Sequence, residues 1–149
     1  MATLPVTTIT YQNEIVQSKI LIGWAKLFKS SQWTSGEETV NFEINFAKLC
    51  QVPYGVAVSS GTMSLWATLK ALGLKAGDEV ITTPMTFSAT ADAIALVGAK
   101  PVFADVDPLT GNLDPVKAAE KITSKTKAIL VVHLYGVPAA VAESSVHHW

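Results

Sequence analysis

Residues 59–62 of the sequence, Ser-Ser-Gly-Thr, have the types and spacing that suit the binding of a phosphate group. Gly61 has no side chain, so the backbone there is able to approach a ligand closely. Thr62 brings a hydroxyl to, or next to, the N-cap of the helix expected from Met63 onward. Unpaired N–H groups and the positive end of the helix dipole favour an anion at such a point. An ordinary helix cap without a ligand is the alternative interpretation, and this stretch alone does not decide between the two.

A second candidate, Phe87, follows the end of another expected strand. It stands beside the small residues Ser88 and Ala89, so that its ring has room to lie flat against a planar ligand. Considered alone, Phe87 is more simply explained as a side chain packed in the hydrophobic core.

Three further residues, His133, Asp105 and Asp107, are explained more simply by structural roles. His133 lies in a strongly apolar run, which favours a hydrogen-bonded core histidine over a catalytic one. The two aspartates follow a strand, where acids usually cap turns, and no histidine or further carboxylate stands at a ligand-like spacing. We therefore predict no metal site. The sequence also holds no dinucleotide fingerprint, no phosphate loop ending in Gly-Lys-Ser/Thr, and no serine-hydrolase elbow.

The elements that must position these residues alternate between strand and helix. An extended arm and two helices, at about 11–28 and 37–50, are expected first. The expected strands then lie at 56–58, 80–84, 100–107 and 126–135, and the helices at 63–72, 91–98 and 114–122. This order predicts an α/β fold with a mainly parallel sheet covered by helices on both faces. Because ligands gather at the carboxyl ends of such strands, residues 59–62, 84–90, 105–107 and 133–136 are expected to line one rim.

Bulk properties restrict the function class. The 149 residues suffice for one domain with a real core, and the formal charge of −1 gives no electrostatic reason to expect binding to nucleic acid or to a membrane surface. No apolar run is long enough to span a bilayer. The single cysteine suits a reducing compartment, so we expect a cytoplasmic protein.

Several motifs occur in an order that resembles one known family. They lie at residues 58–62, 72–81, 86–91, 98–107, 110–115 and 132–138, with looser matches at 33–36 and 42–47. The motifs and their order resemble those of the DegT/DnrJ/StrS family of sugar aminotransferases, and the resemblance covers roughly residues 15–138. The resemblance implies a partial aspartate-aminotransferase-like large domain (fold type I), preceded by N-terminal helices. The implied divisions are 1–52 for the N-terminal arm and helices, 53–138 for an incomplete cofactor-binding domain, and 139–149 for a divergent tail.

The family uses pyridoxal 5'-phosphate, and the resemblance implies a role for each matching residue. Gly61 and Thr62 are expected to bind the cofactor phosphate through backbone N–H groups and the threonine hydroxyl. Phe87 is expected to stack on the pyridine ring. The implied reaction transfers an amino group, commonly from glutamate, to a keto sugar attached to a nucleotide, in a homodimer whose active sites are shared across the interface.

The resemblance also implies what this chain does not contain. In the family, the lysine that bonds the cofactor and the acid that faces its ring nitrogen follow the segment that matches 133–136. All eleven lysines here lie at Lys127 or earlier, so we expect no lysine that bonds the cofactor and no complete set of catalytic residues. We expect the chain to be an amino-terminal part of the enzyme and to be poorly soluble. A related sugar dehydratase and a non-catalytic fragment are the alternative functions.

Overall fold

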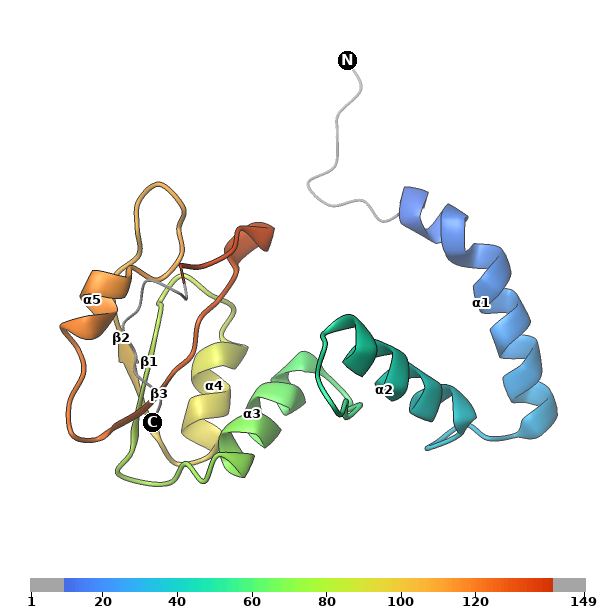
Figure 1. Cartoon of the computed structure of the whole chain (residues 1–149), viewed down its shortest axis with the longest axis horizontal. Coiled ribbons are helices and arrows are strands. Elements are labelled where there is room, and N and C mark those ends of the chain that lie inside the picture. Colours follow the sequence, from blue (N-terminus) through green and yellow to red (C-terminus); the bar gives the residue numbers. More distant parts are fainter. Residues whose placement is uncertain (1–9, 141–149) are drawn as a thin grey trace, which may run out of the picture. The chain divides into compact units, whose positions relative to one another are not determined.

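The structure, a computed structural model, describes residues 10–140, with side chains from residue 13 onward. The chain divides into two compact units, Met1–Ala57 and Val58–Trp149. The described part of the first unit is helical, and the second unit contains a small sheet with helices (Figure 1). None of the described helices has the length and apolar character needed to cross a membrane.

The first unit contains α1 (Thr10–Ser30) and α2 (Glu37–Leu49), which confirm the two predicted helices. Acidic residues Glu37 and Glu38 occupy the first turn of α2, where the helix dipole favours them. After α2 the chain returns along the helix, and the Ala57 N–H donates to Glu43 Oε1 at 2.8 Å. Gly55 permits this approach, because a Cβ there would lie 2.7 Å from the Glu43 carbonyl oxygen.

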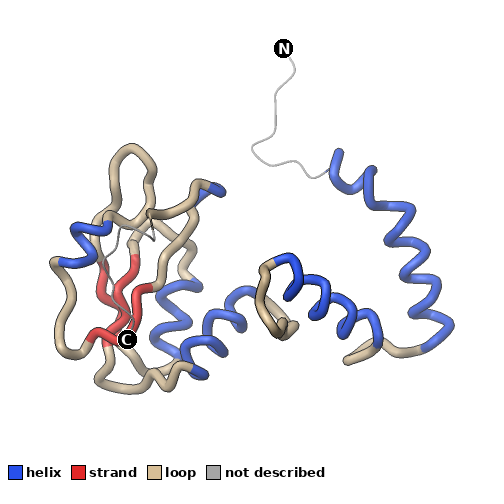
Figure 2. Tube along the Cα trace, in the orientation of Figure 1, coloured by secondary structure: helices blue, strands red, loops and turns tan. Residues whose placement is uncertain are grey.

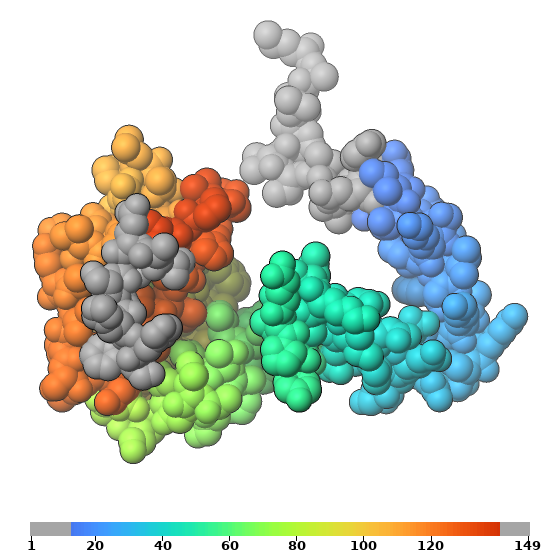
Figure 3. All heavy atoms as spheres, viewed as in Figure 1, coloured from blue at the N-terminus to red at the C-terminus, as the bar shows by residue number. Residues whose placement is uncertain are grey.

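Within this unit the helices leave much apolar surface exposed. Only Ala47 of α2 is buried. The exposed apolar side chains of the two helices are Ile15, Val16, Ile20, Leu21, Ile22, Trp24, Phe28, Val40, Phe42, Ile44, Phe46 and Leu49. The space-filling view shows the atoms of α1 in blue (Figure 3).

The second unit is built on a three-stranded parallel sheet, drawn red in Figure 2. Its strands are β1 (Glu79–Thr82), β2 (Lys100–Phe103) and β3 (Thr126–Ile129), in the order β2-β1-β3. Val80 lies opposite Pro101 on one side and Ala128 on the other. The predicted parallel sheet is therefore confirmed, with three strands in the described residues where four were predicted.

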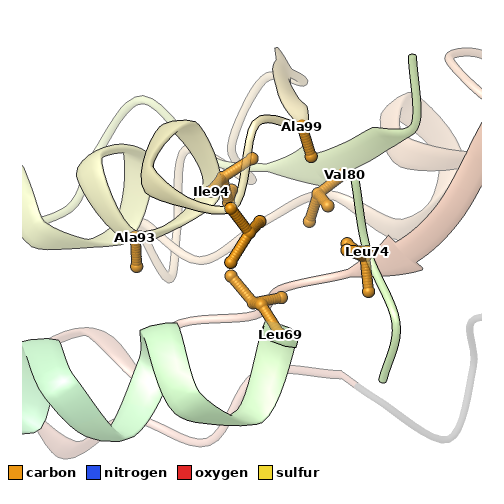
Figure 4. Packing of buried hydrophobic residues seen from close by; sticks show 7 residues of the cluster. Leu69, Leu74, Val80, Ala93, Ile94 and Ala99 are labelled. Carbon is orange, nitrogen blue, oxygen red and sulfur yellow. The ribbon is translucent and has the colours of Figure 1, made fainter. Parts of the chain in front are cut away.

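Helices cover both faces of this sheet. The three helices are α3 (Gly61–Ala71), α4 (Ala89–Leu96) and α5 (Pro115–Ala119), and a short 3₁₀ turn, η1 (Leu134–Gly136), follows β3. Val80, at 0% exposure, packs with residues of α3 and α4, including Leu69 and Ile94 (Figure 4). The next residue, Ile81, is also at 0% exposure and packs on the opposite face with Ala118 of α5. The alternation of neighbouring strand residues thus produces two core layers.

Three strand predictions were wrong in whole or in part, and the strand predicted at 100–107 ends at Phe103. Residues 56–58 form no strand, and Val56 is 80% exposed. The apolar run from 126 pairs only as far as Ile129. Leu130 adds two hydrogen bonds to β1, from its N–H to the Ile81 carbonyl and from the Thr82 hydroxyl to its carbonyl, both at 2.8 Å. The neighbouring strand β1 is only four residues long and is soon followed by Pro84, which has no N–H to offer. The remaining residues therefore leave the sheet as a loop.

Candidate cofactor site

A cleft of about 700 Å³ lies in the second unit, among the segments that follow the sheet and the start of α3. Its lining residues are Gly61, Thr62, Ser64, Leu65, Thr86, Phe87, Ala89, Thr90, Val132, His133, Leu134 and Tyr135. The structure therefore brings together the three residues predicted from sequence, Gly61, Thr62 and Phe87. The lining consists of apolar and hydroxyl side chains with one histidine and contains no lysine or carboxylate.

The first wall of the cleft is the N-terminus of α3. Ser60 is the N-cap, and its hydroxyl accepts from the Met63 N–H at 3.2 Å. The Ser64 N–H donates to the Ser60 carbonyl at 3.0 Å. These bonds leave the N–H groups of Gly61 and Thr62 as the first-turn donors available to a ligand. The cap was predicted at or next to Thr62. It lies two residues earlier, and the serine two positions before the threonine was the signal in the sequence.

Gly61 itself is not required by the fold. Its φ is not in the left-handed region, and a Cβ at this position would meet no heavy atom within 4 Å. Gly61 is also one of the residues that line the cleft. Because the fold does not require glycine at this position, its presence at the start of a helix is consistent with close approach of a ligand to the backbone.

The second wall is the loop between β1 and α4, which carries Phe87. The ring is 77% exposed, so the alternative of a core plug is wrong. Hydroxyl groups fix the loop around it. The Thr86 and Thr90 hydroxyls lie 2.8 Å apart and share a hydrogen bond, and the Met85 N–H donates to Thr83 Oγ1 at 3.0 Å. Phe87 is therefore an exposed aromatic side chain held on an ordered loop.

The third wall is the segment after β3, which includes His133 and Tyr135. His133 Nδ1 accepts from the Ala139 N–H at 2.9 Å, so the histidine is hydrogen-bonded as predicted, but it is exposed and lines the cleft instead of lying in the core. Tyr135 has a φ of 52° and is 90% exposed. Sequence reasoning did not single out this tyrosine, because nothing in the sequence marks a non-glycine residue for the left-handed region.

Asp105 and Asp107 do not line the cleft, which corrects their expected place on the rim. The Asp107 carboxylate instead accepts from the N–H groups of Leu109 and Thr110, at 2.7 and 3.1 Å. It therefore caps a turn, which is the structural role favoured from sequence. Within residues 10–140 there is no group of three or more histidine, cysteine or acidic side chains that could hold a metal ion.

Comparison with known proteins identifies relatives of this chain. A sequence model of the DegT/DnrJ/EryC1/StrS aminotransferase family matches residues 16–145. The "Pleiotropic regulatory protein" of Geobacillus stearothermophilus is 39% identical over 133 residues, which are 89% of this chain and 36% of that protein. The UDP-2-acetamido-2-deoxy-3-oxo-D-glucuronate aminotransferase of Pseudomonas aeruginosa is 41% identical over 125 residues, which are 84% of this chain and 35% of that protein.

Among solved structures, NtdA from Bacillus subtilis with bound cofactor PMP is similar at a TM-score of 0.87 and 33% identity. The match covers 97% of this chain and 34% of NtdA. The likeness confirms the predicted fold class, part of an aspartate-aminotransferase-like α/β domain. The chain spans about a third of the length of the curated relatives that it matches.

Proposed function

Because the chain belongs to the DegT/DnrJ/EryC1/StrS aminotransferase family, we propose that its cleft binds the phosphate and ring of pyridoxal 5'-phosphate. The reaction that it serves is the transfer of an amino group to a keto sugar linked to a nucleotide. One observation carries the proposal: Gly61, Thr62 and Phe87, three residues from two separate segments, line the same cleft.

The residues of the cleft fit the two ends of this cofactor. The N–H groups of Gly61 and Thr62 would donate to the phosphate, which the N-terminus of an eleven-residue helix also favours. The exposed ring of Phe87 would cover one face of the pyridine. When bound, the cofactor supplies an electron sink for transamination, and the protein provides binding and orientation. The lining has no carboxylate that would repel the phosphate.

The substrate class is inferred from the relatives. The relative from Pseudomonas aeruginosa is named for a UDP-linked 3-oxo sugar acid, which agrees with a nucleotide-linked keto sugar as the amino acceptor. Glutamate as the amino donor and a homodimeric assembly, both implied by the family resemblance, are further parts of this proposal, as is a cytoplasmic location, which the single cysteine favours.

The binding proposal is tested with pyridoxamine 5'-phosphate in equilibrium dialysis against the full chain. This probe has the phosphate and ring but forms no bond to a lysine, so its binding depends on the cleft alone. We expect saturable binding with one site per chain. Binding that remains proportional to probe concentration, with no saturation, would contradict the proposal.

Substitutions locate the site. Gly61→Ala should weaken binding at least about 10-fold, because a side chain at this cleft-lining position would hinder the approach of the phosphate to two N–H donors. Its thermal stability should be equal to or higher than that of the natural chain, since alanine is the better helix former. This separation of binding from stability is what a purely structural glycine would not show.

Two further substitutions have matched controls. Thr62→Val should weaken binding about 5-fold or more through the lost hydroxyl, whereas Thr68→Val, an exposed threonine further along α3, should not. Phe87→Ala should weaken binding about 2- to 12-fold through lost stacking, whereas Leu109→Ala, at 94% exposure outside the cleft, should not. Equal effects within either pair would place the ligand elsewhere.

A further inference from the structure

A buried asparagine lies directly behind the third wall of the cleft. Asn112 follows β2 in the chain and is 3% exposed. Its carboxamide makes two hydrogen bonds to a distant segment. Nδ2 donates to the Val137 carbonyl at 2.9 Å, and Oδ1 accepts from the Leu134 N–H at 2.9 Å. These partners stand 25 and 22 residues away in the sequence, so the asparagine joins two separate loops.

The two bonds enclose an unfavourable piece of backbone. Between Leu134 and Val137 lie Tyr135, with a φ of 52°, and Gly136, with a φ of 84°. Gly136 adopts a positive φ at no steric cost, but the left-handed region is disfavoured for a tyrosine and persists only where the surroundings hold it. A backbone bond from the Val137 N–H to the Leu134 carbonyl, at 3.0 Å, closes the turn. The carboxamide satisfies a donor just before these residues and an acceptor just after them. It is therefore placed to hold this turn.

Asn112 is in turn held from its own side. The Asp107 N–H donates to the Asn112 carbonyl at 2.9 Å, and the Asp107 carboxylate caps the turn between them. The neighbouring Gly111 has a φ of 71°, and a Cβ there would lie 3.1 Å from Leu134 Cδ2. The loop 107–112 thus packs tightly against the segment that it supports.

We propose that Asn112 is a positioning residue of the cleft, which fixes the left-handed turn and so sets Tyr135 and His133 on the wall. Asn112 does not line the cleft itself. Only the identity of the ligand, a pyridoxal-type phosphate, rests on the proposed function. The placement of the wall residues rests on the hydrogen bonds alone.

The first test is amide hydrogen exchange followed by NMR on the full chain. In the natural chain the Leu134 amide should be protected, because it donates to a buried oxygen. In Asn112→Ala its exchange, relative to the β1 amides, should accelerate about 5-fold or more, and the Tyr135 and Gly136 resonances should shift. Asn112→Asp keeps the acceptor and loses the donor. It should retain protection at Leu134 while the resonances near Val137 shift.

Asp114→Ala is the matched control. It removes a cap that accepts from Val116 and Lys117 at the start of α5, so it lowers stability without touching the turn. The ratio of exchange rates, Leu134 over β1, should stay within about 2-fold of the natural chain. Asn112 variants that fold but leave the turn resonances unchanged would overturn the proposal. So would an unprotected Leu134 amide in the natural chain, a measurement that needs no variant.

The second test is binding of pyridoxamine 5'-phosphate under conditions where each variant is folded. Asn112→Ala should weaken binding about 3-fold or more, since lost order in one wall raises the cost of binding, and Asp114→Ala should not. If both variants bind as the natural chain does, the wall plays no part in binding and the positioning role is wrong. If the natural chain binds no probe, the proposed function fails in this chain, and the exchange measurements alone decide the role of Asn112.

Discussion

Truncation of Ile94 to alanine should lower the free energy of unfolding more than truncation of an exposed residue on the same helix. Ile94 is at 0% exposure and packs from α4 against Leu69 of α3 and Val80 of β1 (Figure 4). Removing a buried isoleucine to alanine costs about 2–5 kcal/mol, the lost transfer free energy plus the cavity that remains. A unit of the size of Val58–Trp149 has an unfolding free energy of about 5–14 kcal/mol at the usual stability per residue. Ile94→Ala should therefore remove a large fraction of it, and Ile94→Val only about 0.5–1.5 kcal/mol.

The assay is urea unfolding of the full chain followed by circular dichroism, with amide exchange in β1 as a second measure. Leu96→Ala is the control, because Leu96 lies on the same helix and is 66% exposed. Its cost should stay within about 0.5 kcal/mol. The order of destabilisation should be Ile94→Ala, then Ile94→Val, then Leu96→Ala.

Equal midpoints for Ile94→Ala and Leu96→Ala would refute this reasoning. Such a result would mean that α4 does not pack on β1 in solution, and the starts of α3 and α4 would then have no common support. Since these two helix starts frame the cleft, the arrangement of Gly61 and Phe87 would lose its basis as well.

Three further predictions concern local structure. Asp114→Ala should lower stability by about 0.5–2 kcal/mol in thermal unfolding, because its carboxylate caps α5 at 2.8 and 3.2 Å; no change would mean that α5 is not formed in solution. Gly98→Ala should destabilise more than Gly77→Ala, since both glycines have positive φ (86° and 96°) but only at Gly98 would a Cβ lie 3.3 Å from a backbone nitrogen; the reverse order would contradict the packing. Glu120 raises the pKa of Lys117 above 10.5, so the stability from this pair is present below pH 10.5 and is lost as the pH rises through the raised pKa. Because the pair is exposed, Lys117→Met should change the unfolding midpoint very little at pH 7, and a large drop there would refute the surface position.

The helices were the part of the fold best predicted from sequence, because their signals are local. Asp114 followed by proline at the start of α5, and the acids Glu37 and Glu38 in the first turn of α2, are such local signals. The strands were predicted less well, since pairing depends on residues far away in the chain. Val56 has the right residue type and neighbours for a strand, yet residues 56–58 form no strand and Val56 is 80% exposed.

The site residues that were predicted are those whose positions follow from the order of strands and helices alone. Gly61, Thr62 and Phe87 follow the expected element boundaries, and the structure brings them to one cleft; their binding of a cofactor remains a proposal. Tyr135 lies in the segment 133–136 that was expected on the rim, but its left-handed φ and the role of Asn112 were not predicted, because they depend on hydrogen bonds across more than twenty residues. No periodic pattern or short motif encodes such a contact.

The central strand β1 has a consequence for how the second unit unfolds. Val80 and Ile81 belong to different core layers but are neighbours on one strand, and β1 is bonded along both of its edges. If β1 leaves one core layer, its residues in the other layer lose their packing as well. Loss of structure on one face of the sheet therefore extends to the other face. We expect the N–H groups of β1 to be the last to exchange with solvent, at the rate set by complete opening of the unit.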